Sequence, residues 1–417
     1  MSEIRKLTGK QLDEFITIVG HAYPAMKIDT PEEKQRALER LSRPGKGSRI
    51  SLYGLFRRKK MLGVMRLHDF TMNLFATRIP AGGVGMVAVD LMHKKEKVCK
   101  EMILYFLEHY RDRGAPIVLL WPFRPDFYRN MGFGYGAKIN QYRVKPEALP
   151  RGKTKEHIRF LSKKDAPAII DCYQRYFDKT NGMVEGSVAR QETFMDLSPA
   201  LRFAGYEKKG KILGYLAFDF EPVYPGNYVT NDLHIREFIY ESPEVLAEMM
   251  TFLRSQSDQV NRVVFETNDE DLHHLFIDPR NQTGNLVRVA YHECNTGGIG
   301  VMYRVIDTAS LFRALAAHDF GSQTCRVKLA IKDSFLKSND RNIILHFENG
   351  KAELKPKGKF DFEVGLDISD FSSLLMGAVS FRSLYNYGRV GISDAEHVET
   401  MNRIFVTEGK PVCLASF

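Results

Sequence analysis

The sequence predicts an α+β protein of three segments, the first two of which repeat one order of elements. A helical pattern at 10–23, and again at 166–178, is followed by a hairpin, a strand, a helix and a further strand. From Gly297 the pattern changes to alternating strands with few helices. A chain of 417 residues also exceeds one ordinary core and, at ~150 residues per domain, suggests about three. We expect domains at 1–150, 151–296 and 297–417, joined at the first boundary by the polar, proline-bearing stretch 146–155.

Two basic turns mark the predicted hairpins. Arg57-Arg58-Lys59-Lys60 lies between two apolar runs, and so does Lys208-Lys209-Gly210-Lys211. The net charge of +9 raises the question of nucleic-acid binding. Both clusters, however, are typical of solvated hairpin tips, and no recognition-helix motif or aromatic RNA platform accompanies them. We therefore expect no nucleic-acid partner.

The third segment predicts a strand-rich sheet. A strand at 302–307 leads into a helix that ends near Ala316, and the strands 325–331 and 343–347 follow. Glu348-Asn349-Gly350 is a hairpin turn signal. A helix is expected at 368–376.

The composition is that of a soluble globular protein, with 44% hydrophobic and 27% charged residues. No apolar run approaches the ~18 residues that span a bilayer, and the first residues lack the apolar core of a signal peptide. We expect a cytoplasmic protein without a membrane partner. The five cysteines are scattered, and the His273-His274 pair has no further ligand at metal spacing, so we expect neither disulfides nor a bound metal.

The stretch 84–133 carries the strongest functional signal. Val84 to Val89 is β-branched and glycine-flanked, as in a buried strand that another chain or ligand approaches closely. The basic turn 93–97 then opens a helix over 98–110, and a second apolar strand follows at 117–121. Free N–H groups at a helix start, together with lysine side chains, form an anion site suited to a pyrophosphate.

This order of elements, followed by Phe127-Tyr128-Arg129-Asn130-Met131-Gly132-Phe133, resembles the acetyl-CoA site of the GNAT N-acetyltransferases. The resemblance implies that the two strands splay apart and that acetyl-CoA, as cosubstrate, wedges between them. It also implies that the phenol of Tyr128, four residues before Gly132, protonates the departing thiolate. The residues it assigns to acetyl-CoA are Val87, Ala88, Val89, Lys94, Lys95, Lys97, Val98 and Phe123, with the lysines at the phosphates.

One departure concerns the phosphate loop. The family pattern is Arg-x-x-Gly-x-Gly/Ala, whereas Lys94, Lys97 and Cys99 stand at those positions here. Lysine is a point charge without the bidentate fork of arginine. We expect CoA to be held more by charge and less by backbone amides.

The second copy has an acidic turn, 240–244, where the first copy has its basic loop. Because carboxylates repel phosphates, we expect the second copy to be a degenerate GNAT domain without cofactor. The third segment resembles the sterol-carrier-protein-like domain. Together with the runs 367–377 and 384–390, the three segments resemble the Eis (enhanced intracellular survival) acetyltransferases over essentially the full chain.

The Eis resemblance implies a terminal phenylalanine whose carboxylate enters the first domain and acts as general base, a position that Phe417 matches. It further implies a homo-hexamer and a small amine substrate such as an aminoglycoside or a polyamine-like molecule. The apolar end of the chain favours a packed terminus. The reference pKa of a terminal carboxyl, ~3.3–3.7, is low for a base, so burial or a relaying water is expected to assist.

Two alternatives stay open. One is a protein lysine acetyltransferase. The other is a lipid-binding or scaffold protein with vestigial acyltransferase sites, favoured by the loss of loop glycines. Acidic residues for an amine pocket, among them Asp29, Glu32 and Glu33, cannot be told from surface charge by sequence.

Overall fold

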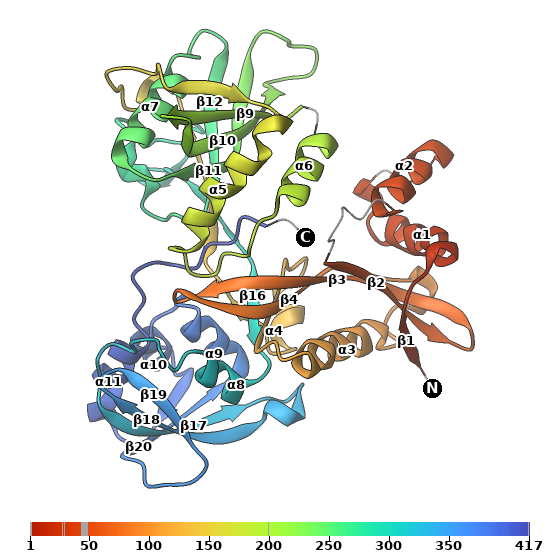
Figure 1. Ribbon diagram of the computed structural model, residues 1–417, viewed down its shortest axis with the longest axis vertical. Helices are drawn as coiled ribbons and strands as arrows, with labels where there is room; N and C mark the ends of the chain where they lie inside the picture. Colours follow the sequence, from red (N-terminus) through yellow and green to blue (C-terminus); the bar gives the residue numbers. More distant parts are fainter. Residues whose placement is uncertain (1, 27, 29, 43–48, 199, 416) are drawn as a thin grey trace. The chain divides into compact units, whose positions relative to one another are not determined.

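A computed structural model describes residues 2–26, 28, 30–42, 49–198, 200–415 and 417 (Figure 1). These residues form two compact units. The first holds the described residues up to Gly136, then Val301–Pro411 and Ala415–Phe417; the second holds Ala137–Gly300 and Val412–Leu414.

The first unit is built on a sheet of strand order β1-β2-β3-β4-β5-β16-β6, in which β4 and β5 run parallel and the other neighbours antiparallel. The side chains of β3 alternate between two cores: Leu62 and Met65 pack with helix α3, whereas Met61 and Val64 pack with helix α1. The elements are β1 (Glu3–Lys6), η1 (Gly9–Gln11), α1 (Leu12–Ala22), η2 (Pro24–Met26), α2 (Pro31–Ser42), β2 (Ile50–Arg57), β3 (Lys60–Leu74), β4 (Thr77–Val89), η3 (Leu91–His93), α3 (Val98–Asp112), β5 (Ile117–Leu120), α4 (Pro125–Arg129), β6 (Gly134–Tyr135) and β16 (Met302–Val305).

The second unit repeats this plan with the strand order β8-β9-β10-β11-β12-β7-β15, read from the corresponding edge. Again one central pair, β11 and β12, is parallel. Its elements are β7 (Lys138–Val144), η4 (Pro146–Ala148), β8 (Ile158–Leu161), η5 (Lys163–Asp165), α5 (Ala166–Phe177), α6 (Val188–Leu197), β9 (Arg202–Lys208), β10 (Lys211–Pro222), β11 (Asn231–Tyr240), α7 (Pro243–Arg254), β12 (Val260–Thr267), η6 (Leu272–Leu275), β13 (Leu286–Arg288), β14 (Tyr291–His292) and β15 (Thr296–Ile299). The predicted repeat and both hairpin turns are present in the structure.

The sixth strand of each sheet comes from the other half of the repeat. Strand β16, which follows the whole second copy in sequence, inserts between β5 and β6, and β7, which precedes that copy, inserts between β12 and β15. The compact units therefore divide near residues 136 and 300, whereas the sequence suggested 150 and 296. The stretch 146–155, expected to be a join, lies within the second unit, where Leu149 is fully buried.

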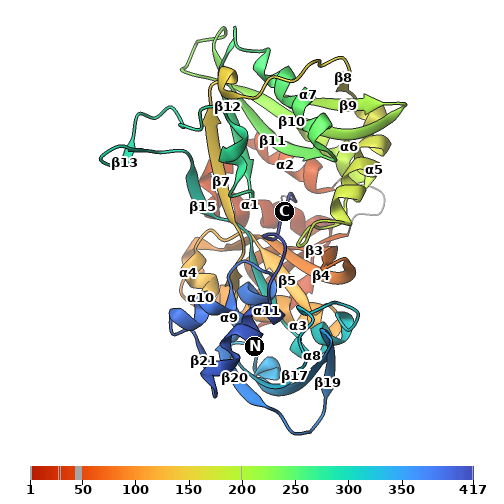
Figure 2. The ribbon, with the colours of Figure 1, turned by 90° about the vertical axis from the view of Figure 1, so that its left-hand side faces the viewer.

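The C-terminal part of the first unit contains a separate sheet of order β19-β18-β17-β20-β21, seen in the lower half of Figure 2. Its predicted hairpin turn has Asn349 at φ 48° and Gly350 at φ 79°, both in the left-handed region that a two-residue hairpin requires. The elements are α8 (Thr308–Ala314), β17 (Cys325–Lys332), η7 (Lys337–Asn339), β18 (Arg341–Glu348), β19 (Lys351–Lys355), β20 (Phe362–Asp367), α9 (Ile368–Leu375), α10 (Phe381–Asn386), β21 (Val390–Ile392), η8 (Ala395–His397) and α11 (Val398–Ile404).

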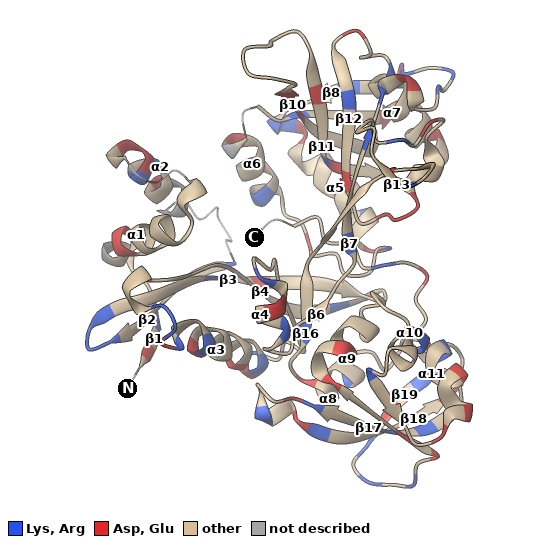
Figure 3. Cartoon of the chain, turned by 180° about the vertical axis from the view of Figure 1, so that it is seen from behind, with Lys and Arg blue, Asp and Glu red and all other residues tan. Residues whose placement is uncertain are grey.

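Charged residues of both signs are interspersed along the described elements (Figure 3). Across those parts of the chain, no helix combines the length and the apolar character needed to cross a bilayer.

Candidate active site

Strands β4 and β5 separate where the sequence predicted a splayed pair. Their parallel pairing runs from Ala81↔Ile117 to Val84↔Leu120, where β5 ends, while β4 continues to Val89 alongside β3. A bulge at Met86, whose φ is 48°, bends β4 directly after the last pair. The end of β4 thus has β3 as its neighbour on one side and no β5 partner on the other.

The three β4 residues expected to contact pantetheine lie along this end. Ala88 is buried in the α1-side core, and Val87 and Val89 pack against the α3-side core. The Val87 carbonyl already accepts a hydrogen bond from the phenol of Tyr23 at 2.8 Å. A pantetheine amide that donates to this carbonyl would therefore share or replace the Tyr23 bond.

The loop before α3 keeps a glycine-like backbone without glycines. Lys95 and Lys97 have φ of 67° and 62°, a left-handed conformation that costs a residue with a side chain about 1–2 kcal/mol. Lys97 is the N-cap of α3 and makes no side-chain cap hydrogen bond. The side chains of Lys94, Lys95 and Lys97 are exposed, and Val98 behind them is buried. The helix start is therefore uncapped and carries three lysines beside Glu96 and Glu101, and both glutamates are bonded to Arg57.

The basic hairpin turn between β2 and β3 holds this loop in place. Arg57 donates to the Glu96 carbonyl at 3.1 Å, to Glu96 Oε2 at 3.3 Å and to Glu101 Oε1 at 2.7 Å. Lys60 Nζ lies 3.0 Å from His93 Nε2. The turn is the predicted hairpin tip, and Lys60 is exposed there. Arg57, however, is half-buried and binds residues 39 and 44 positions further along the chain, which leaves no local sequence signal.

Tyr128 lies on α4, and the spacing to Gly132-Phe133 has a geometric cause. The Phe133 N–H donates to the Tyr128 carbonyl at 3.2 Å, and the Gly132 N–H donates to the Arg129 carbonyl at 2.9 Å. With Gly132 at φ 83°, this is a Schellman motif, in which the residue after the glycine packs on the third-last helical residue. The rings of Tyr128 and Phe133 do so, with centroids 5.9 Å apart.

The phenol of Tyr128 is 3% exposed. Burial raises its pKa well above the usual value, and the neighbouring Cys99 and Tyr23 raise it further. Burial also raises the pKa of the Cys99 thiol to about 12. These groups all stay protonated at neutral pH. Phe123, predicted to touch acetyl-CoA, is exposed and meets the Tyr128 ring edge-on at 5.8 Å.

The C-terminus reaches the same stretch of β4. The Phe417 ring packs edge-on against Phe70 and His68, with centroids 5.1 and 5.5 Å apart. A Cβ at Gly85 would lie only 2.8 Å from the Phe417 carboxyl carbon, so the absence of a side chain there admits the terminus. Trp121 Nε1, directly after β5, donates to the Ala415 carbonyl at 3.1 Å.

A cation accompanies the terminal carboxyl. Arg66 Nη2 lies 3.6 Å from the point at which Gly85 would carry its Cβ, on β3 opposite Gly85. Arg66 Nε donates to His68 Nε2 at 2.9 Å, which assigns the ring as an acceptor at that nitrogen. A guanidinium beside a carboxylate stabilises its ionised form.

Sequence reasoning found Tyr128 and the lysine loop but missed Tyr23, Arg66, His68 and Trp121. The usable signal was the alternation Arg66-x-His68-x-Phe70, which puts these side chains on one face of β3. Of the acidic candidates, Glu32 is exposed, and Glu33 accepts from the Thr30 N–H at 3.1 Å as a helix cap of α2. Asp29 lies outside the described residues. No three His, Cys, Asp or Glu residues in the described ranges are grouped to hold a metal ion.

Comparison with known families agrees with this geometry. Residues 3–136 and 185–298 each match an acetyltransferase (GNAT) domain family, and residues 311–414 match the sterol carrier protein domain family. A curated protein of Streptomyces avermitilis, named an uncharacterized N-acetyltransferase, is 25% identical over 339 residues, covering 75% of this chain and 76% of that protein.

Three solved structures share the fold over the whole of both chains. A GCN5-related N-acetyltransferase from Anabaena variabilis has a TM-score of 0.82 at 18% identity, and a probable N-acyltransferase from Enterococcus faecalis has 0.80 at 20%. Eis1 from Mycobacterium abscessus has a TM-score of 0.76 at 16% identity.

The fold and the matched domains define a GNAT-type acetyltransferase. The chain consists of two tandem GNAT domains followed by a sterol-carrier-protein-like domain, as the sequence predicted. It is an acyl-CoA-dependent N-acetyltransferase, and acetyl-CoA is the cosubstrate that GNAT domains use.

Proposed function

We propose that this enzyme transfers acetyl from acetyl-CoA to a primary amine of a small cationic substrate, such as an aminoglycoside, by direct attack of the amine on the thioester. The observation that carries the proposal is the position of the Phe417 carboxyl against Gly85. Two residues further along β4, the Val87 carbonyl accepts a hydrogen bond from Tyr23, and Val87 packs against the core cluster that contains Tyr128. The proposal therefore assigns the carboxylate and the buried phenol to one stretch of the expected acetyl-CoA strand.

The cosubstrate would be held from two directions. The uncapped start of α3 and the side chains of Lys94, Lys95 and Lys97 suit the phosphates. The unpaired side of β4 from Val87 to Val89 suits the pantetheine arm. These assignments orient the thioester toward Tyr128.

Tyr128 is proposed as the acid for the leaving thiolate. As the amine nitrogen bonds to the acetyl carbon, the carbon–sulfur bond breaks and the sulfur takes the phenol proton, which solvent later restores. Because the pKa of Tyr128 is raised above that of a free phenol, full transfer of its proton to the thiolate is less favourable. Much of the assistance is therefore a hydrogen bond from the phenol to the developing thiolate. It also keeps the phenol protonated across the neutral range.

Phe417 is proposed as the group that receives the amine. Its carboxylate attracts the ammonium form and takes the nitrogen's proton directly or through water. The nearby Arg66 favours the ionised carboxylate, which suits cation binding better than strong basicity. The wider proposal includes a homo-hexamer in the cytoplasm, testable by analytical ultracentrifugation and by fractionation.

The direct test is thiol release from acetyl-CoA with an aminoglycoside, spermidine and a lysine-containing peptide as acceptors. Saturation by the small amines at lower concentration than the peptide supports the proposal, and the reverse order favours a protein lysine acetyltransferase. Tyr128→Phe should lower kcat by ~10²-fold or more. Tyr135→Phe, a matched change on β6, should leave kcat within about twofold.

The terminal carboxylate can be tested without altering any side chain. One glycine added after Phe417 moves the carboxylate by about 3.5 Å. We expect kcat/KM to fall ~10²-fold, because a misplaced catalytic group loses most of its effect. Phe417→Leu, which keeps the carboxylate in place, should retain more activity than the extended chain. Equal activity of the extended and native chains would remove Phe417 from the mechanism.

A further inference from the structure

Helix α9 of the sterol-carrier-like domain presents a buried carboxylate to the element that carries Tyr128. Asp370 on α9 is 3% exposed, and its Oδ1 accepts from Arg129 Nη2 at 2.5 Å. Its Oδ2 accepts from Arg389 Nε and Nη2 at 3.1 and 2.8 Å. Arg129 directly follows Tyr128 in the sequence, so the residue next to the proposed acid is held by an ion pair with a buried carboxylate.

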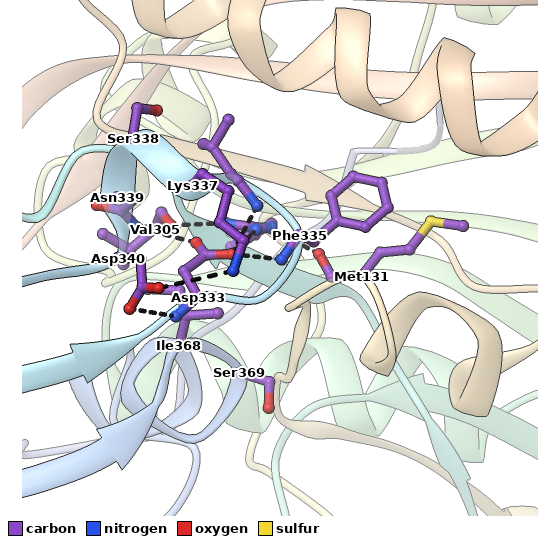
Figure 4. A network of polar contacts seen from close by, with 12 residues as sticks. Met131, Val305, Asp333, Phe335, Lys337, Ser338, Asn339, Asp340, Ile368 and Ser369 are labelled. Atoms are coloured by element: carbon purple, nitrogen blue, oxygen red, sulfur yellow. Dashed lines mark hydrogen bonds and ion pairs between the residues drawn. The ribbon is translucent and has the colours of Figure 1, made fainter.

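A second contact from the same part of the chain holds the end of α4. Arg304 on β16 donates from Nε to the Met131 carbonyl at 2.7 Å and from Nη2 to Asp333 Oδ1 at 2.8 Å. Figure 4 shows Asp333 at the centre of this network, with Met131 at its margin. Both charged side chains are fully buried. The Met131 carbonyl is one that the end of a helix leaves without an intrahelical partner.

Helix α9 and strand β6 also approach closely at the backbone. A Cβ at Gly134 on β6 would lie 2.6 Å from Ser373 Oγ and 2.7 Å from the Ser373 nitrogen of α9. Ser372 Oγ accepts from the Val305 N–H at 3.0 Å. Small serines on α9 therefore let this helix lie directly against β6 and β16, the strands that flank the Tyr128 turn.

A helix as short as α4 cannot fix its own direction, because one turn gains few hydrogen bonds against the entropy of ordering it. Its orientation must come from its neighbours. The charged contacts at Arg129 and Met131 fall one and three residues after Tyr128, at the C-terminal end of α4.

We propose that Asp370 is a positioning residue for acetyl transfer, which acts through Arg129 to hold the Tyr128 phenol in its working direction. The sterol-carrier-like domain thereby serves the chemistry of the first GNAT domain. This inference rests on the proposed role of Tyr128 as the acid. Misplacement of a catalytic group by about 1 Å can cost ~10²-fold in rate, so a loosened anchor should lower kcat measurably.

The first experiment uses Asp370→Asn in the full chain. We expect kcat to fall about tenfold with the KM for acetyl-CoA changed less than about twofold, since the lysine loop is on another element. Asp361→Asn breaks an exposed ion pair with Arg326 in the same domain and should leave kcat unchanged. An unchanged kcat in Asp370→Asn would overturn the inference.

A double-mutant cycle separates positioning from general damage to the fold. If Asp370 acts through the phenol, Asp370→Asn should cause no further loss of kcat in a Tyr128→Phe background. The same fold-loss in both backgrounds would overturn the inference while leaving the acid role of Tyr128 intact. If Tyr128→Phe alone leaves kcat unchanged, Tyr128 is not the general acid and that part of the proposed function is wrong.

A milder variant covers the case in which Asp370→Asn does not fold. Arg129→Lys keeps the charge and leaves Asp370 bound to Arg389, but it loses the planar fork. We expect a kcat reduced about threefold, again absent in the Tyr128→Phe background. A loss of the same size in that background would count against the inference.

Discussion

The two GNAT copies differ most at the start of one equivalent helix. In the first copy, α3 begins at Lys97 without a side-chain cap and behind three exposed lysines. In the second copy, the Ser242 side chain caps α7 by accepting from the Val245 N–H, and Pro243 removes a donor altogether. Glu244 adds negative charge to this first turn. The two helix starts thus differ in whether a side chain satisfies the first N–H groups, whereas both carry a glutamate in the first turn, Glu101 in α3 and Glu244 in α7. We propose that this difference decides which copy binds phosphates.

The splayed strands, in contrast, are common to both copies. In the second copy, parallel pairing ends at Ile235↔Phe265, and β11 bulges at Arg236 directly afterwards, as β4 bulges at Met86. Beyond the bulge, however, the second copy carries Glu237, bonded to the Tyr215 phenol at 3.0 Å, instead of a valine. No tyrosine lies on η6, which follows β12 as α4 follows β5. We infer that the second copy keeps the separated strands but does not bind acetyl-CoA, because Glu237 stands where the first copy has Val87.

The largest expected effect comes from making the first copy resemble the second. Lys97→Glu reverses a charge at the uncapped helix start, and we expect the Kd for CoA to rise ~100-fold, the scale of one lost charge-assisted contact with added repulsion. Isothermal titration measures it. Lys209→Glu, on the hairpin turn of the second copy, is the matched control and should leave Kd unchanged. Equal affinities for native chain and Lys97→Glu would place the phosphates elsewhere.

The second prediction concerns Glu237. Burial raises the pKa of its carboxyl to about 7, against the partial opposition of Tyr215 and Arg190. The folded state then holds a proton that the unfolded state releases between about pH 4.5 and 7, so this contribution to stability is complete at low pH and is lost as pH rises through that window. Glu237→Gln should stabilise the protein by about 1–3 kcal/mol at pH 8 relative to pH 5, compared with the native chain.

Thermal unfolding of both chains at the two pH values checks the Glu237 prediction. The difference between chains matters, because other groups titrate identically in both. A Tm difference that does not change with pH would show that the carboxyl keeps its usual pKa.

A smaller effect is expected from Tyr23→Phe. Its hydroxyl bonds the Val87 carbonyl that pantetheine is proposed to use, and one neutral hydrogen bond contributes about 0.5–1.5 kcal/mol. Removal of this competitor should lower the KM for acetyl-CoA two- to tenfold. Steady-state kinetics with varied acetyl-CoA measures it, and a raised KM would instead make Tyr23 a ligand of the cosubstrate.

For the last variant, Glu244→Lys, we expect no change in the number of CoA molecules bound. Glu244→Lys gives the second copy a lysine but leaves the Ser242 cap and Pro243 in place. Titration should still find one CoA per chain. A second binding event would mean that charge alone, and not the free helix start, makes the anion site.

The sequence predicted those features that are set by residues close to one another along the chain. The family resemblance selected Tyr128 by its position four residues before Gly132. The structure gives this offset a local cause, because a Schellman motif needs glycine at one fixed position. The strand, basic turn and helix of the lysine loop followed from local periodicity. Lys95 and Lys97 in left-handed conformations did not, since lysine gives no sign of a positive φ.

What sequence could not supply is long-range pairing. Nothing local to Arg57 or Asp370 indicates a partner, and each is placed by folding of distant segments. The exchange of β7 and β16 is the clearest case, because a strand's periodicity tells which face is buried but not which sheet receives it.

That exchange has a consequence for biosynthesis. The sheet of the first unit is complete only when β16, residues 302–305, has been synthesised, some 170 residues after β6. At translation speeds of ~5–20 residues per second, the first lobe stays unfinished for roughly ten to thirty seconds. During that interval the strand edges of β5 and β6 are available to chaperones, and Phe417, the proposed general base, arrives last of all.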